Sequence, residues 1–343
     1  MTAENTRDRL LDVKGLSVEI DGRGGRAVVV DGIDLHVTRG ETLGVVGESG
    51  CGKSLTMLSL MRLLPNKIKV TKGSADFDGQ DLQKMSARAL RKVRGGDIGF
   101  VFQDPMTSLN PVMKVGDQIC EPLLYHRGMS RKDARERAVE LLQLVGIPGP
   151  QERLNAYPHE LSGGMRQRVM IAIGLACDPK LLIADEPTTA LDVTIQAQIV
   201  DLVKQLRAKL GMSVVWITHD LALIAGLVDR VAVLYAGTVV EDAPVDELYA
   251  RPSHPYTRGL LGAVPSAAHA RGRLAAIEGI VPELVDPARA CRFAGRCPHE
   301  AAVCTSDDPL LLPIAPEHDV ACFIHHPAPG SAGKRPSFAE RTR

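Results

Sequence analysis

The chain has 343 residues, of which 45% are hydrophobic, so it can bury a substantial core and is long for one compact domain. Basic and acidic residues number 41 each, and this balance argues against nucleic acid as the main partner, because phosphate binding usually leaves a basic footprint. The polar residues 1–15 lack the apolar core of a signal peptide, and no stretch reaches the roughly 18 consecutive apolar residues of a membrane-spanning helix. We therefore expect a soluble protein from the reducing cytosol.

The first hundred residues predict several short strands and one helix. A helical pattern runs from Leu55 to Leu64 and ends before Pro65. Residues 73–82 predict a hairpin, and the apolar run at 97–102 predicts a buried strand. Three earlier apolar segments alternate with Gly and Asp turns and predict strands, at residues 10–20, 27–37 and 41–46.

The rest of the chain is first helical and then alternating. Residues 114–178 have helical periodicity, with Ser130 as an expected N-cap and Gly146 as an expected stop. Strands then alternate with helices, which predicts a parallel sheet with crossover helices. The strands are expected at 181–185, 213–218 and 230–235, and the helices at 194–211 and 221–228. Proline becomes frequent near Arg251 and periodicity weakens, so we expect an α/β fold followed by a small irregular extension and a disordered tail at 331–343.

The segment GESGCGKS, residues 47–54, fits the pattern G-x-x-x-x-G-K-S/T between an apolar strand and a helix. Glycines let the backbone wrap an anion, and the loop N–H groups with the helix N-terminus point at phosphates. Lys53 would neutralise the β- and γ-phosphates, and Ser54 would ligate Mg²⁺. A glycine-rich turn with a chance lysine is the alternative, which the strand and helix context disfavours. The residues predicted to bind nucleotide are Gly47, Glu48, Ser49, Gly50, Cys51, Gly52, Lys53 and Ser54.

Acidic residues end one of the later strands. Asp185 and Glu186 follow the apolar run in LLIADEP, where an Asp can hold the Mg²⁺ shell and a Glu can polarise a water for attack on phosphate. His219 ends the strand at 213–218, at the sheet edge where ligands gather in such folds. An ordinary acidic strand end and a structural histidine are the alternatives.

Five pieces in order resemble the ATPase subunit of an ATP-binding cassette (ABC) transporter over residues 10 to about 250. They are GESGCGKS at 47–54, Gln103 in VFQDP, LSGGMRQR at 161–168, LLIADEPTTALD at 181–192, and His219. The resemblance implies a P-loop NTPase cassette at 1–250. This cassette has a mixed sheet, an antiparallel β subdomain and an inserted helical subdomain at about 104–178. An extension follows at 251–330.

The resemblance also implies roles for individual residues. Glu186 is the catalytic base, and His219 contacts the γ-phosphate and orders that base. Ser54, Gln103 and Asp185 surround Mg²⁺. Gln103 and the helical segment after it transmit closure to the membrane subunits.

The segment LSGGMRQR separates this family from other P-loop proteins, because its Ser and two Gly precede a helix as a second anion-binding site. In the family, two subunits face head to tail and sandwich two ATP molecules. The resemblance implies that Ser162, Gly163 and Gly164 contact the partner's ATP and that Asp192 links the two sites. Met165 stands where the usual motif has Gln.

Residues 102–111, 157–172 and 252–265 are similar to the oligopeptide/dipeptide importer subgroup, which also contains ATPases for nickel and antimicrobial peptides. The chain resembles the first of the two paralogous ATPases of that subgroup. This implies a heterodimer with a related ATPase at the cytoplasmic face of the cell membrane. Two permease subunits and an extracytoplasmic peptide-binding protein complete the implied assembly. Ile20 stands where the family usually stacks adenine on an aromatic ring, so adenine would rest on aliphatic surface.

The extension contains four of the seven cysteines. Their spacing lacks the tight pair typical of structural zinc sites and suits an iron–sulfur cluster, whose irons are spread apart. Extended members of the importer subgroup have a similar cysteine pattern, and the resemblance implies a 4Fe–4S cluster. Zinc and simple packing of buried thiols remain alternatives. The predicted ligands are Cys291, Cys297, Cys304 and Cys322.

The sequence leaves three functional readings open. The leading one is an ATPase that powers peptide import, with nickel or another small solute as alternative cargo. A cassette ATPase of DNA repair or translation is disfavoured, because such proteins usually carry two cassettes or a long coiled-coil insertion, and this chain has neither. A third reading makes the cysteine extension a redox sensor that regulates transport.

Overall fold

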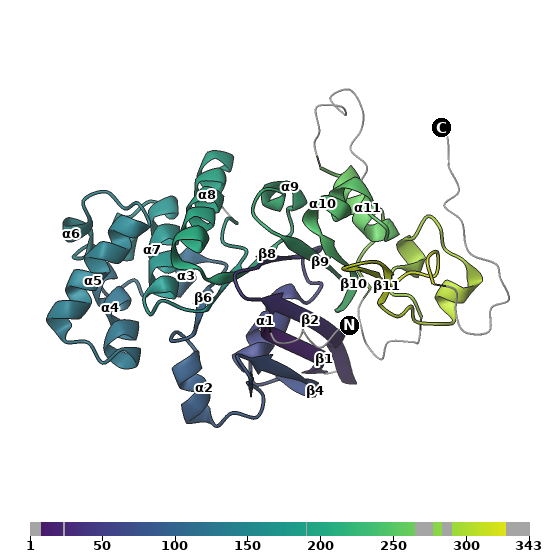
Figure 1. Cartoon of the computed structure of the whole chain (residues 1–343), viewed down its shortest axis with the longest axis horizontal. Helices are drawn as coiled ribbons and strands as arrows, with labels where there is room; N and C mark the ends of the chain where they lie inside the picture. Colours follow the sequence, from purple (N-terminus) through teal and green to yellow (C-terminus); the bar gives the residue numbers. More distant parts are fainter. Residues whose placement is uncertain (1–7, 23–24, 190, 265–276, 283–289, 327–343) are drawn as a thin grey trace. The chain divides into compact units, whose positions relative to one another are not determined.

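The computed structural model describes residues 8–22, 25–189, 191–264, 277–282 and 290–326 (Figure 1). The predicted disordered tail at 331–343 lies outside the described residues. The chain divides into two compact units, and each is made of segments that are far apart in sequence. The first unit comprises Met1–Leu11, Val37–Thr42 and Asp76–Thr218, and the second comprises Asp12–His36, Leu43–Ala75 and His219–Arg343. The predicted boundary at residue 250 stays a prediction.

The first unit contains three parallel strands in the order β8-β7-β6, and these confirm three strands of the sequence analysis. They are β6 (Ile98–Val101), β7 (Leu181–Asp185) and β8 (Ser213–Thr218). Every residue of β7 and β8 is buried, as expected for strands covered on both faces. The short strand β5 (Gln80–Asp81) pairs with the end of β4 (Ile68–Phe77) through a Gly79 turn, so the predicted hairpin is confirmed.

Helices make up most of the remainder of the first unit. They are α2 (Ala87–Val93), α3 (Pro105–Ser108), α4 (Val115–His126), α5 (Arg131–Leu144), α6 (Pro150–Arg153), the 3-10 helix η1 (Pro158–Glu160), α7 (Gly163–Leu175) and α8 (Val193–Leu210). Ser130 caps α5 by accepting a hydrogen bond from the Asp133 N–H, as predicted. A Cβ on Gly99 of β6 would lie 2.2 Å from the Gly174 carbonyl oxygen, so α7 crosses that strand in direct backbone contact.

The second unit contains most of the strands β2, β1 and β4, which neighbour one another in that order. The strands β1 (Arg9–Gly22) and β2 (Gly25–Thr38) confirm the predicted N-terminal strands. The buried strand β3 (Thr42–Val46) leads into α1 (Lys53–Leu60). This helix ends four residues before the predicted Leu64, since Arg62 adopts a left-handed φ of 49° that breaks the helical geometry.

A second set of strands in this unit has the order β11-β12-β10-β9-β3. Its strands are β9 (Arg230–Tyr235), β10 (Thr238–Pro244), β11 (Leu312–Ala315) and β12 (His318–Val320). β3 and β9 are parallel, whereas β9–β10, β10–β12 and β12–β11 are antiparallel. Besides α1, the described helices of the second unit are α9 (Leu221–Ile224), α10 (Val245–Ala250), α11 (Pro255–Gly262) and the 3-10 helices η3 (Ala294–Arg296) and η4 (Ala302–Thr305).

The described part of the C-terminal region contains more regular secondary structure than its sequence predicted. Two helices follow β10, beside β9 and β10 in Figure 1, and the β11–β12 hairpin adds to the edge of β10. Glu241 of β10 pairs with Val320 of β12, so the extension adds its hairpin to the set of strands that contains β3, β9 and β10. The helix predicted at 221–228 is shorter than expected and ends at Ile224. Within the described residues, no helix is long and apolar enough to cross a membrane.

Candidate nucleotide and cysteine sites

The predicted phosphate loop follows β3 and closes around glycines. Gly50 and Gly52 have φ values of 79° and 100°, a region that side chains rarely allow. A Cβ on Gly47 would lie 2.2 Å from the carbonyl oxygen of Leu234 in β9, so the loop has no room for a side chain there. Ser49 and Gly50 at the crown are exposed, which leaves the loop backbone open to a ligand. This geometry fits the phosphates of a nucleotide.

Lys53 is held inside this loop at the first residue of α1. Its Nζ donates to the carbonyl oxygens of Gly47 at 2.8 Å and Glu48 at 3.0 Å, and the side chain is buried. Cys51 packs beneath the loop, with its Sγ 4.0 Å from the Lys53 Nζ. Burial raises the pKa of the Cys51 thiol. Lys53 therefore gives the loop a fixed positive charge for phosphate, and the Cys51 thiol adds no negative charge that would repel it.

Glu186, the predicted base, belongs to the first unit and leaves β7 with a left-handed φ of 43°. Its Oε2 accepts hydrogen bonds from the Gln103 amide at 3.0 Å and from the Thr189 hydroxyl at 3.0 Å. The backbone N–H of Glu186 donates to Ile217 of β8. The structure thus brings together two predicted residues, Gln103 and Glu186, and adds Thr189, which the sequence analysis did not single out.

The predicted signature residues stand at the start of α7. Ser162 caps that helix by accepting from the Met165 N–H at 3.4 Å, and Ser162 and Gly163 are exposed. A Cβ on Gly164 would lie 2.9 Å from the Ile195 side chain of α8, so α7 and α8 begin in close contact. An exposed, glycine-rich N-terminus of a 13-residue helix suits an anion supplied from outside this chain.

The remaining predicted polar residues lie at the ends of secondary-structure elements. Asp192 caps α8 by accepting from the Ile195 N–H at 3.0 Å. Ser54 is in the first turn of α1, Asp185 ends β7, and His219 follows the last residue of β8. The hydroxyl, carboxylate and amide oxygens of the predicted magnesium ligands are of the kind that Mg²⁺ prefers.

The four cysteines of the extension line one cavity, together with His254, Phe293 and other side chains. The backbone N–H of Cys291 donates to the Cys304 carbonyl at 2.9 Å, and Cys304 packs against Phe323 in a small apolar cluster. The structure therefore gathers four cysteines that are up to 31 residues apart in sequence, namely Cys291, Cys297, Cys304 and Cys322.

Three thiols of this cavity have raised pKa values. Burial raises the pKa of Cys291 to about 12 and that of Cys322 to about 11, and the neighbouring cysteines reinforce both shifts. Burial also raises the pKa of Cys297. Among the described residues, no three His, Cys, Asp or Glu side chains are placed to hold a single metal ion. A cluster or a zinc ion in this cavity therefore stays a prediction.

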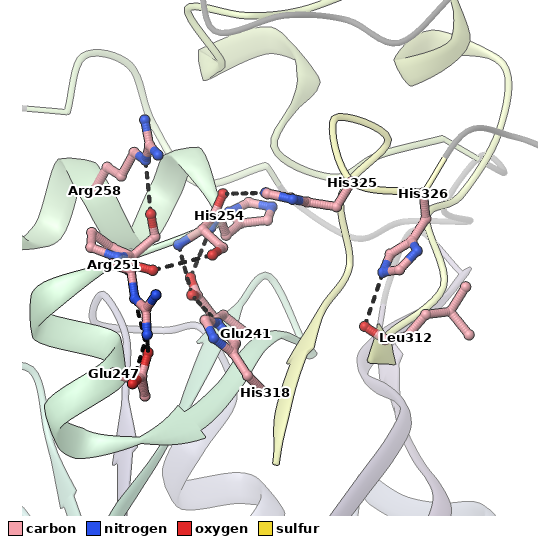
Figure 2. A network of polar contacts seen from close by, with 11 residues as sticks. Glu241, Glu247, Arg251, His254, Arg258, Leu312, His318, His325 and His326 are labelled. Atoms are coloured by element: carbon pink, nitrogen blue, oxygen red, sulfur yellow. Dashed lines mark hydrogen bonds and ion pairs between the residues drawn. The ribbon is translucent and has the colours of Figure 1, made fainter. Parts of the chain in front are cut away.

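A buried carboxylate anchors this extension. Glu241 is fully buried and accepts hydrogen bonds from the backbone N–H groups of Ser253 and His254, each at 2.8 Å (Figure 2). The His318 ring of β12 contacts its Oε1 at 2.9 Å. Although burial acts to raise the pKa of Glu241, hydrogen bonds led by that of His318 leave it lowered. One carboxylate therefore ties the start of α11 to the C-terminal hairpin. Nothing in the sequence around Glu241 indicates that its carboxylate binds two segments that are distant along the chain.

Two family models match the chain. The model described as ABC transporter matches residues 30–189, and the model described as oligopeptide/dipeptide transporter, C-terminal region, matches residues 240–304. The first range contains the phosphate loop, Gln103, the signature segment and Glu186. The second contains α11 and three of the four clustered cysteines.

Several relatives cover nearly the whole chain. A probable peptide ABC transporter ATP-binding protein, y4tR of Sinorhizobium fredii, is 51% identical over 94% of this chain and 97% of its own length. The oligopeptide transport ATP-binding protein OppD of Bacillus subtilis is 49% identical over 93% of this chain and 90% of its own length. The dimeric post-hydrolysis structure of the ATP-binding cassette MJ0796, bound to ADP and phosphate, is 30% identical. It covers 68% of this chain and 98% of that one, with a TM-score of 0.62. The chain therefore belongs to the ABC transporter ATPases, in the branch that carries the oligopeptide/dipeptide transporter C-terminal region.

Proposed function

We propose that this chain hydrolyses ATP to power the import of peptides through a membrane ABC transporter. The observation that carries the proposal is the match of residues 240–304 to the oligopeptide/dipeptide transporter C-terminal region, in a chain that also has the cassette motifs. Relatives about half identical over nearly the full length are named as peptide transport ATP-binding proteins, which supports the same cargo class.

We propose that the ATP site works through four sets of residues. The loop at 47–54 binds the phosphates, with Lys53 neutralising their charge. Glu186 accepts a proton from the attacking water, and Gln103 with Thr189 holds its carboxylate in place. His219 contacts the γ-phosphate. Mg²⁺, when bound by Ser54, Gln103 and Asp185, lowers the negative charge on the reacting phosphates.

The proposed assembly contains two ATPase chains and a membrane part. The partner is a related ATPase, and Ser162, Gly163 and Gly164 complete its ATP site while Asp192 links the two sites. The exposed N-terminus of α7 supports this arrangement. Two permease subunits hold the pair at the cytoplasmic face of the membrane, and an extracytoplasmic binding protein delivers the peptide.

We also propose a 4Fe–4S cluster in the cysteine cavity, with zinc as the alternative. The joint lining of one cavity by Cys291, Cys297, Cys304 and Cys322 supports a resident group. Such a group would stabilise an extension whose own apolar cluster is small.

The function is tested by transport in reconstituted vesicles that contain this chain, its paralogue, the permeases and the binding protein. ATP-dependent uptake of a labelled dipeptide or oligopeptide is expected, and Lys53→Ala should abolish it. Uptake of nickel without peptide would replace the cargo assignment. Failure to co-purify with membrane subunits, combined with full ATPase activity of the chain alone, would favour the soluble cassette ATPase.

A further inference from the structure

Glu48 of the phosphate loop contacts the C-terminal extension with both its side chain and its backbone. Its carboxylate accepts from Arg296 through Nη1 at 2.6 Å and Nη2 at 2.9 Å. Its backbone N–H donates to the hydroxyl oxygen of Tyr256 at 2.8 Å. Arg296 and Tyr256 both lie beyond residue 250, so the extension binds both the side chain and the backbone of Glu48.

Arg296 is fixed where it stands. Its side chain is only 7% exposed, and its Nε donates to the Glu278 carbonyl at 2.9 Å. Its guanidinium lies over the Tyr235 ring, 5.6 Å from the centroid. A two-pronged arginine–carboxylate pair fixes orientation as well as distance, and a buried guanidinium cannot shed its charge when the carboxylate leaves. Glu48 is therefore held in one position.

Tyr256 is equally constrained. It is fully buried, and its ring packs against Tyr235 at 4.7 Å and Phe293 at 5.5 Å between centroids. Phe293 lines the cysteine cavity. The hydroxyl that receives the Glu48 N–H is thus positioned by an aromatic cluster shared with the extension.

A second set of contacts connects the extension to the loop through Ala236 and Gly237. Arg292 donates to the Ala236 carbonyl and to the Asp31 carboxylate. The next residue, Gly237, donates its N–H to the Cys51 carbonyl of the loop at 3.0 Å. Arg292 directly follows Cys291 in the sequence, and Arg296 directly precedes Cys297. Both arginines are therefore sequence neighbours of cysteines that line the cavity.

We propose that the C-terminal extension is a clamp on the phosphate loop, in which Arg296 and Tyr256 are positioning residues that hold Glu48 and thereby raise the affinity for ATP. The carbonyls of Gly47 and Glu48 also receive the Lys53 ammonium, so a displaced Glu48 moves the cation that meets the phosphates. The proposal rests on ATP binding by this loop.

The test is equilibrium ATP binding to the purified full-length chain, measured by titration calorimetry together with thermal unfolding. Arg296→Gln is expected to raise the ATP Kd about tenfold, and Arg296→Lys less, because a lysine keeps the charge but loses the fork. Arg251→Gln is the matched control: it removes another extension arginine with a carboxylate partner, Glu247, which lies outside the loop. Its Kd should equal that of the unaltered chain.

A gentler pair of variants covers the case in which Arg296→Gln fails to fold. Tyr256→Phe removes only the hydroxyl that accepts from Glu48 and should raise the Kd about threefold or more. Tyr249→Phe is its control, because the Tyr249 hydroxyl donates to the Leu221 carbonyl instead. In steady-state ATPase assays with the partner, the clamp variants should raise KM while kcat changes little.

A double variant separates a clamp from general weakening. Glu48→Gln combined with Arg296→Gln should raise Kd no more than the larger single change, since both act through one contact. Additive effects would overturn the proposal. So would an unchanged Kd in folded Arg296→Gln and Tyr256→Phe proteins. If the unaltered chain binds no ATP, the ATPase assignment fails instead, and that outcome is distinct from equal binding by all variants.

Discussion

The amide of Gln103 donates a hydrogen bond to the carboxylate of Glu186, with 3.0 Å between Gln103 Nε2 and Glu186 Oε2. The Thr189 hydroxyl donates to the same oxygen. Glu186 also occupies a left-handed backbone conformation, which is costly for a residue with a side chain and persists where surrounding contacts enforce it. The proposed base is therefore held at both its backbone and its carboxylate.

Replacing Glu186 by Gln should leave ATP binding intact and reduce turnover by at least about a hundredfold, because the amide keeps the shape but cannot take a proton. The variant should accumulate as an ATP-bound closed dimer with its paralogue. ATPase rate, ATP affinity and size-exclusion elution report these effects. Glu247→Gln, which alters an exposed carboxylate paired with Arg251, should behave like the unaltered chain. Normal hydrolysis by Glu186→Gln would remove Glu186 from the role of base.

Thr189→Val tests the second donor to Glu186. Valine has a similar shape but no hydroxyl, so kcat should fall roughly five- to twentyfold with little change in KM, as expected from loss of one hydrogen bond to a charged group. Thr305→Val is the control, since its hydroxyl donates to the Ala302 carbonyl within the extension. Equal kcat for both variants would mean that the Thr189 contact does not position the base.

His254 should make folding stability fall in mild acid. Burial lowers the pKa of His254 to about 4, and its Nδ1 accepts from the Tyr256 N–H at 3.0 Å. The unfolded chain has a histidine pKa of about 6.5, so protons favour unfolding as the pH falls from about 6.5 toward 4. The stabilisation is fully present above that window and decreases by about 2 kcal/mol at pH 5.

The comparison is between urea unfolding of the unaltered chain and of His254→Asn, each at neutral pH and near pH 5. Asparagine supplies an acceptor at the start of α11 without a titrating ring. His325, whose pKa burial also lowers, titrates in the same direction in both proteins and cancels in the difference. The loss of stability on acidification should be smaller in His254→Asn, and an identical loss would contradict the assignment.

The cysteine cavity is tested by metal and acid-labile sulfide analysis of anaerobically purified protein. A bound cationic group stabilises the thiolate form of the cysteines that hold it. The proposed cluster therefore predicts equal amounts of iron and acid-labile sulfide, with a broad brown absorbance. Cys297→Ser should lose it, while Cys177→Ser, which alters a buried thiol of the first unit, should keep it. Zinc alone would establish the alternative, and a folded, active protein without metal would mean that the thiols only pack.

Much of the local architecture was predictable. Strands β3, β7, β8 and β9 are continuous apolar runs because both of their faces are buried, and that pattern is visible without coordinates. The Ser130 cap and the glycines of the phosphate loop follow from local backbone chemistry in the same way. The helix predicted at 221–228 was too long, since apolar periodicity cannot show where a short helix ends.

The sequence by itself determined the family, the motif residues and the grouping of four cysteines near the C-terminus, because each of these is written in residues close together along the chain. Only the tertiary structure decided that Arg296 meets Glu48 across 248 residues of sequence, that Glu241 holds His318, and that Thr189 shares Glu186 with Gln103. Such contacts arise when separate segments pack, and a buried charge then takes whichever partner the fold brings within reach. A single arginine or glutamate carries no local pattern that names its partner in advance.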